Sequence, residues 1–282
     1  MRARAPASSA NLGPGFDALA VALALYVEVT VEPADHLSVT TTGEGADLPT
    51  DANHLAARVA VEAAGHANLA ISVHSDIPVG RGLGSSAALA VAAAAAAGGD
   101  PLGAGIAIDG HPENAAASAL GGLVCAATVH GEPVAHRLPL DPHLAFVVVV
   151  PDRQLPTKQA REALPASLPH ADAAFNLGRM GLLVAGLADH RLLVSAATED
   201  RLHQRYRGPL FPEADPIMSG LLAAGALAAC WSGAGPSILG ICTAGAASRV
   251  AEAGAKLLAE WGLAGQVRQL APDHQGVVVT PA

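Results

Sequence analysis

The chain has 282 residues, of which 51% are hydrophobic, so it can bury the core of one large domain or of two moderate ones. Its formal net charge of −9 and its lack of any lysine and arginine cluster argue against a nucleic-acid-binding surface. Three cysteines without metal-ligand spacing, no apolar leader and no apolar run of membrane length predict a cytoplasmic protein with reduced thiols and no membrane partner.

Apolar patterns predict several strands and helices in the first half of the chain. After an N-terminal loop, the pattern predicts strands at 19–31, 37–42 and 70–74 and a helix at 53–64. An alanine-rich run over 87–97 predicts a buried helix, which we expect to end at the Gly98-Gly99-Asp100-Pro101 turn.

A second half begins near the apolar run at 145–150, which predicts a buried strand ended by Pro151. Beyond it, the pattern predicts helices at 171–187, 189–202, 216–224 and 245–261, and strands at 230–231 and 238–241. Together these elements indicate a two-lobed α+β protein. We place the boundary between two domains after residue 148, so the expected domains cover 1–148 and 149–282.

The segment most informative about function joins a glycine-rich turn to the alanine-rich helix. Glycines at 80, 82 and 84 let successive N–H groups converge on an anion, and the start of a helix adds its dipole and unpaired donors. The Ser86 hydroxyl could also face Mg²⁺, or Ser85 or Ser86 could simply cap the helix. The expected nucleotide-binding residues are Pro78, Val79, Gly80, Arg81, Gly82, Leu83, Gly84, Ser85, Ser86, Ala87 and Ala88.

This segment resembles the P-x-x-x-G-L-G-S-S-A-A motif of the GHMP small-molecule kinases. It is not a Walker A motif, because no lysine follows the last glycine. Four other blocks resemble the homoserine kinases within this superfamily, and they keep family order between residues 6 and 240. They are Pro6–Asp17, Gly110–Asn114 followed by Gly121-Gly122, Pro156–Arg161 and Ser232–Ser237.

The resemblance implies a two-lobed GHMP kinase fold. Its N-terminal ATP-binding lobe would be like domain 2 of ribosomal protein S5, with a left-handed β-α-β unit, and its C-terminal lobe would be ferredoxin-like. The implied activity is ATP-dependent phosphorylation of L-homoserine to O-phospho-L-homoserine in threonine biosynthesis, with Mg²⁺ as a cofactor. L-homoserine and ATP are then the expected partners, and a homodimer would be the usual assembly.

A kinase for a free amino acid must hold a carboxylate, an ammonium group and a hydroxyl in line with ATP. Arginine suits the carboxylate because its planar group donates two parallel hydrogen bonds. The resemblance assigns this role first to Arg161 and second to Arg207, whereas an arbitrary arginine usually lies on a solvated surface. We expect Arg161 and the Asp17 carboxylate to be the catalytic residues.

The ammonium group needs an acceptor, and Asp17 is the expected one, with Asn11 on the same loop. An Asx turn is the alternative explanation for both residues. By resemblance, His111 and Asn114 on a third loop and the Thr157 hydroxyl complete the substrate-binding set. A strong general base is not required, because alignment and charge stabilisation supply most of the acceleration in phosphoryl transfer.

One position departs from the superfamily pattern. In these kinases a glutamate about one helical turn before the histidine of the middle block helps to bind Mg²⁺, but the residue four before His111 is Ala107. Asp109 is the nearest carboxylate, and Glu113 stands where an aspartate is more typical. We therefore expect Ser86 and Asp109 to bind the metal, or else a poorly formed metal site and weak activity.

Two alternatives to homoserine phosphorylation stay open at this point. The chain could phosphorylate another small hydroxylated metabolite, in which case Arg161 and Arg207 need not meet around a carboxylate-sized pocket. It could also be a catalytically weakened homologue that binds a nucleotide or a partner, as the missing glutamate suggests. Turnover of ATP with homoserine distinguishes these functions.

Overall fold

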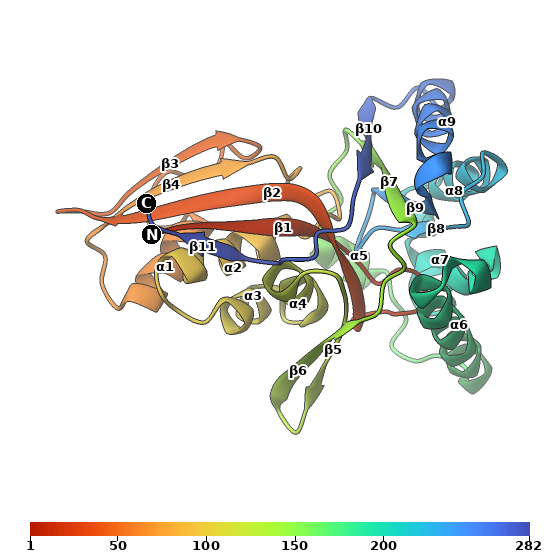
Figure 1. Cartoon of the computed structure of the whole chain (residues 1–282), viewed down its shortest axis with the longest axis horizontal. Coiled ribbons are helices and arrows are strands. Elements are labelled where there is room, and N and C mark those ends of the chain that lie inside the picture. The colour runs from red at the N-terminus through yellow and green to blue at the C-terminus, as the bar shows by residue number, and fades with distance from the viewer.

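The structure is a computed structural model that describes all 282 residues, and each of its two lobes is built on a β-sheet (Figure 1). The strands of the first sheet are β1 (Arg2–Ala10), β2 (Leu19–Pro33), β3 (Ser38–Gly43), β4 (Leu69–Ser75), β5 (Leu123–Val129), β6 (Glu132–Leu138) and β11 (Val278–Thr280). The helices of this lobe are α1 (Leu55–Ala64), α2 (Ser85–Ala96), α3 (Pro101–Asp109) and α4 (Glu113–Leu120).

The long strand β2 organises the first sheet. It pairs with β1 along one edge and with β4 and β5 along the other, in the order β11-β1-β2-β4-β3, and the β5–β6 hairpin joins the start of β2. Residues 19–23 are buried in succession, whereas burial alternates from Ala24 to Val31, as in a strand with one covered face. Only β3 and β4 are parallel, and α1 connects them in a β-α-β unit.

Helix α2 is surrounded by other elements, which explains its alanine content. Every residue from Ala90 to Ala96 is buried, and the helix contacts β1, β2, α1, α3 and α4. Alanine combines high helix propensity with a small side chain, so neighbouring backbones can approach closely. α3 then begins at Pro101, and the Asp100 carboxylate caps it by accepting the N–H of Leu102. The Gly98–Pro101 segment therefore ends one helix and begins the next.

The second lobe contains an antiparallel sheet with the order β10-β7-β9-β8. Helices α8 and α9 pack on this sheet over a separate apolar core that includes Val149, Phe211 and Trp231. The chosen domain boundary after residue 148 lies within β7 and stays a prediction. The elements of this lobe are β7 (Leu144–Pro151), α5 (Thr157–Glu162), α6 (His170–Ala188), α7 (Gln204–Arg207), α8 (Ala214–Ala223), β8 (Ala228–Trp231), β9 (Ile238–Thr243), α9 (Ala247–Glu260) and β10 (Gly265–Leu270).

Three local expectations were wrong. The expected helix at 189–202 is replaced by two short 3₁₀ turns, because Asp189 adopts an extended backbone and its side chain accepts the N–H of Arg191. The N-terminal segment forms strand β1, whose small alanines and buried serines lack the large apolar residues that mark a strand. Asn114 lies in the first turn of α4, and only His111 stays on the expected loop.

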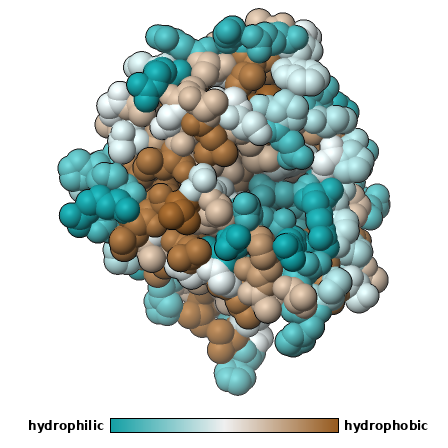
Figure 2. Space-filling view, turned by 90° about the vertical axis from the view of Figure 1, so that its right-hand side faces the viewer, coloured by the Kyte–Doolittle hydropathy of each residue, from teal (hydrophilic) through white to brown (hydrophobic).

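The surface of the second lobe carries several exposed apolar side chains. Figure 2, which faces this side of the molecule, shows apolar patches separated by polar ones. Leu177 and Leu182 on α6, and Leu192 and Val194 in the segment after it, are exposed. The expected homodimer stays a prediction. Among the helices, none combines the length and apolar character needed to cross a membrane.

Candidate active site

A cavity of about 300 Å³ collects most of the residues that the sequence singled out. It receives the loop after β1, the glycine turn before α2, the α3–α4 segment, the start of α5 and the end of α7. The expected site residues that line it are Asn11, Asp17, Gly80, Gly82, Leu83, Gly84, Ser85, Ser86, Asp109, His111, Asn114, Thr157, Arg161 and Arg207.

Five residues of the expected nucleotide-binding segment do not line this cavity. Pro78, Ala87 and Ala88 are buried behind it, so they support the turn by packing. Arg81 forms an ion pair with Asp152, so its guanidinium charge is paired outside the cavity. Val79 lines a second cavity on the other side of the turn.

The glycine turn leaves the start of α2 without a side-chain cap. Gly80, Gly82 and Gly84 all have positive φ angles, and Gly84 itself occupies the N-cap position. No side chain hydrogen-bonds to the first turn, so the alternative in which Ser85 or Ser86 caps the helix does not hold. Uncapped N–H groups and the positive end of the helix dipole therefore face the cavity, which is a favourable environment for phosphate.

Gly82 brings the glycine turn against a second glycine-rich turn of the other lobe. A Cβ at Gly82 would lie 2.2 Å from the backbone oxygen of Ser232. The Ser232 hydroxyl contacts the Gly82 oxygen at 2.7 Å and the Ser9 hydroxyl at 2.8 Å. The absence of a side chain at position 82 thus serves lobe packing as well as access to the cavity.

Asp17 and Arg161 meet in a two-pronged ion pair. Nη1 of Arg161 lies 3.1 Å from Oδ2 of Asp17, and Nη2 lies 2.8 Å from Oδ1. Both side chains are about one-third exposed, at the mouth of the cavity. Asn11 holds the loop that carries Asp17, because its side chain accepts the Asp17 N–H and donates to the oxygen of Gly233. Asn11 therefore already has a positioning role, through a bond to the N–H of a residue six positions on and not through an Asx turn.

Arg207 is almost completely buried, with 2% of its surface exposed, and yet it reaches the cavity. Its guanidinium donates to the oxygens of Ala160 and Gly233 and to Nδ1 of His203. Burial, together with the nearby Arg161 charge, lowers the pKa of Arg207 to about 10, so it stays protonated at neutral pH. Nη2 has no hydrogen-bond partner within the chain and is available to a ligand.

Three acidic or basic groups from the α3–α4 segment line the part of the cavity wall beside Asp17. Nδ1 of His111 lies 2.7 Å from Oε1 of Glu113, whose side chain is 1% exposed. Oε2 of Glu113 is buried without a partner. Burial alone would lower the pKa of His111, but Glu113, with Asp17 and Asp109, raises it overall. Burial raises the pKa of Asp109 to about 6, and Glu113 adds to this rise.

The donor set of this wall fits a hard cation. His111 and the carboxylates of Asp17 and Glu113 offer ligand atoms within 4.8 Å of one another, and Asp109 lines the same cavity. Ala107, at the position of the missing glutamate, is exposed and does not line the cavity. Mg²⁺ prefers carboxylate and hydroxyl oxygens, and the unpartnered oxygen of Glu113 is a group that such an ion would satisfy.

Comparisons with known proteins show which family the chain belongs to. The GHMP kinases N terminal domain matches residues 52–122, and the GHMP kinases C terminal domain matches residues 178–260. A homoserine kinase from Moorella thermoacetica is 38% identical, with 98% of each chain covered. A homoserine kinase from Streptomyces avermitilis is 42% identical, with 100% of this chain and 96% of the other covered. The chain belongs to the homoserine kinase family.

Solved structures place this homoserine kinase family member on the GHMP kinase fold. The structure of homoserine kinase from Cytophaga hutchinsonii has a TM-score of 0.87 and 29% identity, and the match covers 99% of this chain and 97% of that one. The structure of L. major mevalonate kinase has a TM-score of 0.72 at 16% identity and shows the fold alone. The predicted two-lobed fold is thereby confirmed.

Sequence reasoning missed two residues that pack beside the cavity arginines, Phe16 and His203. Phe16 stacks on the His203 ring at 5.2 Å, and the guanidinium carbons of Arg161 and Arg207 lie 5.6 and 5.5 Å from the Phe16 ring centre. His203 is fully buried and contacts the oxygen of Gly13 at 2.8 Å. Phe16 lies in the Pro6–Asp17 block, but nothing in the sequence around either residue indicates that His203 lies beside it.

A second cavity, of about 270 Å³, was also missed. It shares Ser85 and Ser86 with the first cavity, and most of its wall is apolar, including Leu48, Leu55 and Leu89. These residues come from the β3–α1 segment and α2, so no single motif could mark them. Among its polar groups are Thr41 and His54, whose Oγ1 and Nε2 atoms are 3.3 Å apart.

Proposed function

We propose that this chain catalyses the ATP-dependent phosphorylation of L-homoserine to O-phospho-L-homoserine in threonine biosynthesis. The observation that carries the proposal is the meeting of Arg161, Arg207 and Asp17 in the cavity that also receives the uncapped start of α2. Two guanidinium groups and a carboxylate suit the two charges of an amino acid, and the helix start suits the phosphates of ATP. Homoserine kinase relatives that span the whole chain support the same assignment.

The buried Arg207 is the stronger candidate for the substrate carboxylate. Its Nη2 group is free, whereas both terminal nitrogens of Arg161 already bond to Asp17. A substrate that inserts between Arg161 and Asp17 would place its carboxylate against the arginines and its ammonium group against the Asp17 oxygens. The zwitterion would thus replace one ion pair, Arg161 with Asp17, by two: its carboxylate with the arginines and its ammonium group with Asp17. Both partners are already held in place before the substrate binds.

The polyphosphate would lie on the glycine turn, with the nucleoside in the second cavity. Nδ1 of His54 accepts the N–H of Ala56, so the proton of the ring lies on Nε2 and points to Thr41 Oγ1. Burial lowers the pKa of His54, which favours this neutral form. The Thr41 hydroxyl is then free to donate to an acceptor nitrogen of a base held between the apolar residues.

Asp109, Glu113 and Ser86 are the residues we propose as oxygen ligands for Mg²⁺. When bound, the ion would neutralise charge that develops on the transferred phosphoryl group. Asp17 and His111 would orient the substrate hydroxyl, and either can accept its proton as the new O–P bond forms and ADP leaves. Loose transition states need little help from a base, so the main task of these residues is to hold the hydroxyl in line.

A substrate panel that removes one charge at a time tests the proposal. We expect turnover of L-homoserine and at least about 30-fold lower kcat/KM for 4-hydroxybutyrate, which lacks the ammonium group, and for 3-aminopropanol, which lacks the carboxylate. Losing one partner of a buried charge pair costs roughly 2–5 kcal/mol, which sets this scale. Mevalonate, the substrate of a different GHMP kinase, is the control for specificity. Equal turnover of mevalonate and homoserine would contradict the proposal, and ATP binding without any homoserine turnover would indicate a weakened homologue.

A further inference from the structure

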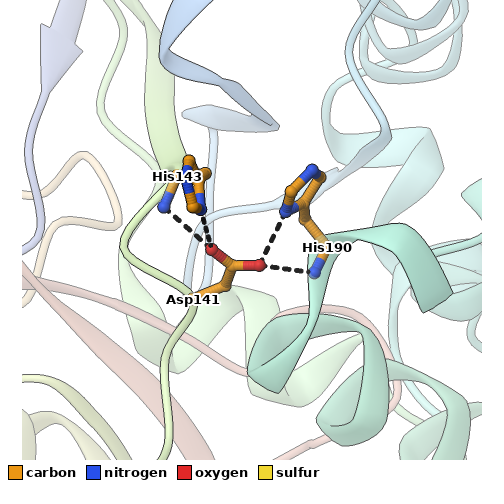
Figure 3. Close-up of side chains that lie close together, drawn as sticks. All are labelled: Asp141, His143 and His190. Atoms are coloured by element: carbon orange, nitrogen blue, oxygen red, sulfur yellow. Dashed lines mark hydrogen bonds and ion pairs between the residues drawn. The ribbon is translucent and has the colours of Figure 1, made fainter.

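A second cluster of metal-binding side chains lies outside both cavities. Asp141 and His143 lie just before β7. His190 is the first residue of the 3₁₀ turn that follows α6. Figure 3 shows the Asp141 carboxylate between the two imidazole rings, with one ring facing each oxygen. None of the three residues lines the active-site cavity, so the proposed kinase function does not use them.

The carboxylate is held from several directions. Oδ1 of Asp141 accepts the backbone N–H of His143 and contacts Nδ1 of the same residue, both at 2.9 Å. Oδ2 accepts the N–H of His190 at 2.8 Å and contacts its Nδ1 at 2.6 Å. The Asp141 N–H in turn donates to the oxygen of Leu187. Backbone groups therefore orient the carboxylate even without the imidazoles.

We propose that Asp141, His143 and His190 form a binding site for a first-row transition-metal ion such as Zn²⁺. Each carboxylate oxygen has a second lone pair that now receives an imidazole N–H, and a cation could take the place of those protons. In that state both rings carry their proton on Nε2 and present Nδ1 to the ion. Two imidazoles and one carboxylate, with water, are a donor set that Zn²⁺ uses.

The spacing of the ligand atoms suits a shared ion. Ligands about 2.0–2.1 Å from one tetrahedral Zn²⁺ ion lie roughly 3.3–3.4 Å apart. The two Nδ1-to-oxygen distances, 2.9 and 2.6 Å, are shorter than this, and the ligand atoms of all three residues lie within 4.8 Å of one another. Small side-chain rotations would bring the three ligands to one centre.

Exposure gives the ion an entry path. The His143 side chain is 74% exposed, the His190 side chain 27% and the Asp141 side chain 8%, so the site is open on one side and anchored on the other. A bound ion would join the segment before β7 to the turn after α6. The two histidines in these segments, His143 and His190, are 47 positions apart in the sequence. Mg²⁺ should bind poorly here, because it prefers oxygen ligands over imidazole.

Calorimetric titration of the full chain with Zn²⁺ tests the site. The variant His143→Gln keeps a side chain that can donate to Asp141 but is a poor zinc ligand, and His190→Ala removes the second imidazole. His36→Ala, at an exposed histidine with no hydrogen bond, is the matched control. We expect the wild type and His36→Ala to bind equally, and His143→Gln and His190→Ala to bind at least tenfold more weakly at one site. Circular dichroism should be unchanged for His143→Gln, because this side chain is exposed.

The active-site cluster of Asp17, His111 and Glu113 could also bind Zn²⁺, and neither substitution would change it. Binding at that cluster is therefore fitted as a separate site in the titration. Thermal melting gives an independent readout, because saturating Zn²⁺ should raise the Tm of the wild type and of His36→Ala by more than that of His143→Gln. No Zn²⁺ binding by the wild type, or equal binding and equal Tm shifts in all variants, would overturn the site and leave Asp141 as a purely structural link.

Discussion

At the scale of single residues, the surroundings of Asp109 raise the pKa of its carboxyl group toward neutral pH. Burial raises its pKa to about 6 and Glu113 adds to the rise, while His111 and Arg161 oppose it. Ionisation is costly in such an environment unless a cation accompanies it. The charge of Asp109 should therefore depend on whether a metal ion shares the cavity, which makes this residue a sensitive test of the proposed Mg²⁺ site.

We predict that Asp109→Asn lowers kcat by roughly 10- to 100-fold and raises the Mg²⁺ concentration needed for half-maximal rate. The KM for homoserine should change much less, because the residue lies with the metal ligands and not with the arginines. Steady-state kinetics over a range of Mg²⁺ concentrations measures both effects.

Ala107→Glu is the matched control for Asp109→Asn. It restores a glutamate at the superfamily position, but position 107 is exposed and lies off the cavity wall, so we expect no gain in rate or in metal affinity. Wild-type kinetics for Asp109→Asn together with improvement in Ala107→Glu would show that Asp109 is not a ligand and that the metal site is incomplete.

The buried His203 should make stability depend on pH. Burial, together with the Arg207 charge, lowers its pKa from 6.5 to about 4. The neutral ring accepts from Arg207 and donates to the oxygen of Gly13. The unfolded chain then binds more protons than the folded chain between pH 6.5 and 4. Stability from this residue is fully present above pH 6.5 and is lost as the pH falls toward 4, by roughly 3 kcal/mol over the full shift.

Urea unfolding at pH 7.0 and pH 5.0 measures this loss. His203→Gln keeps one donor and one acceptor without a titratable group, so its free energy of unfolding should fall less between these pH values than that of the wild type. The variant is expected to be less stable at pH 7, and only the difference between the two pH values is informative. An identical pH dependence in both proteins would show that His203 does not control it.

At the scale of elements, the glycine turn before α2 serves two neighbours. Gly80 and Gly82 both have positive φ angles, +69° and +76°, so a side chain at either position strains the backbone similarly. They differ in surroundings. A Cβ at Gly80 would have as its nearest neighbour the flexible Gln154 side chain at 3.6 Å, whereas one at Gly82 would meet a backbone oxygen of the other lobe at 2.2 Å.

We predict that Gly82→Ala is less stable than Gly80→Ala by about 1–3 kcal/mol, the usual cost of forcing extra volume into a packed site. ATP binding, titrated under conditions where each variant is folded, should weaken more for Gly82→Ala because the turn must shift. Urea denaturation midpoints provide the stability comparison. Equal midpoints would mean that the second glycine turn yields easily and that Gly82 matters only for the nucleotide.

Local signals allowed some elements and site residues to be predicted from the sequence. The alanine run of α2 and the apolar run of β7 are visible because burial on all sides leaves a continuous pattern. The blocks Pro6–Asp17 and Pro156–Arg161 located Asp17 and Arg161, and the resemblance to the family assigned Arg207, which lies outside those blocks. Their mutual geometry was not accessible: that Arg161 pairs with Asp17 across 144 positions depends on how the lobes meet.

At the scale of the whole molecule, the lobes are joined through the site. Asn11 and Arg207 both donate to the oxygen of Gly233, and Ser232 bonds to both Ser9 and Gly82. The Arg207 bond lies within the second lobe, but the other three contacts join segments at least 150 residues apart, which periodicity within a short window does not report. For the same reason no local pattern indicated that the end of the chain returns to the first sheet, where β11 pairs with β1.

That return has a consequence for synthesis on the ribosome. Residues 2–4 of β1 pair on one side with β2, which follows within the first 33 residues, but on the other side with Val278–Thr280. The first sheet can therefore assemble early while this edge of β1 waits, with its backbone groups unpaired, for almost the entire remaining chain to be translated. An open edge of this kind can pair with other nascent chains, so the last strand acts as a late closure that ends this exposure.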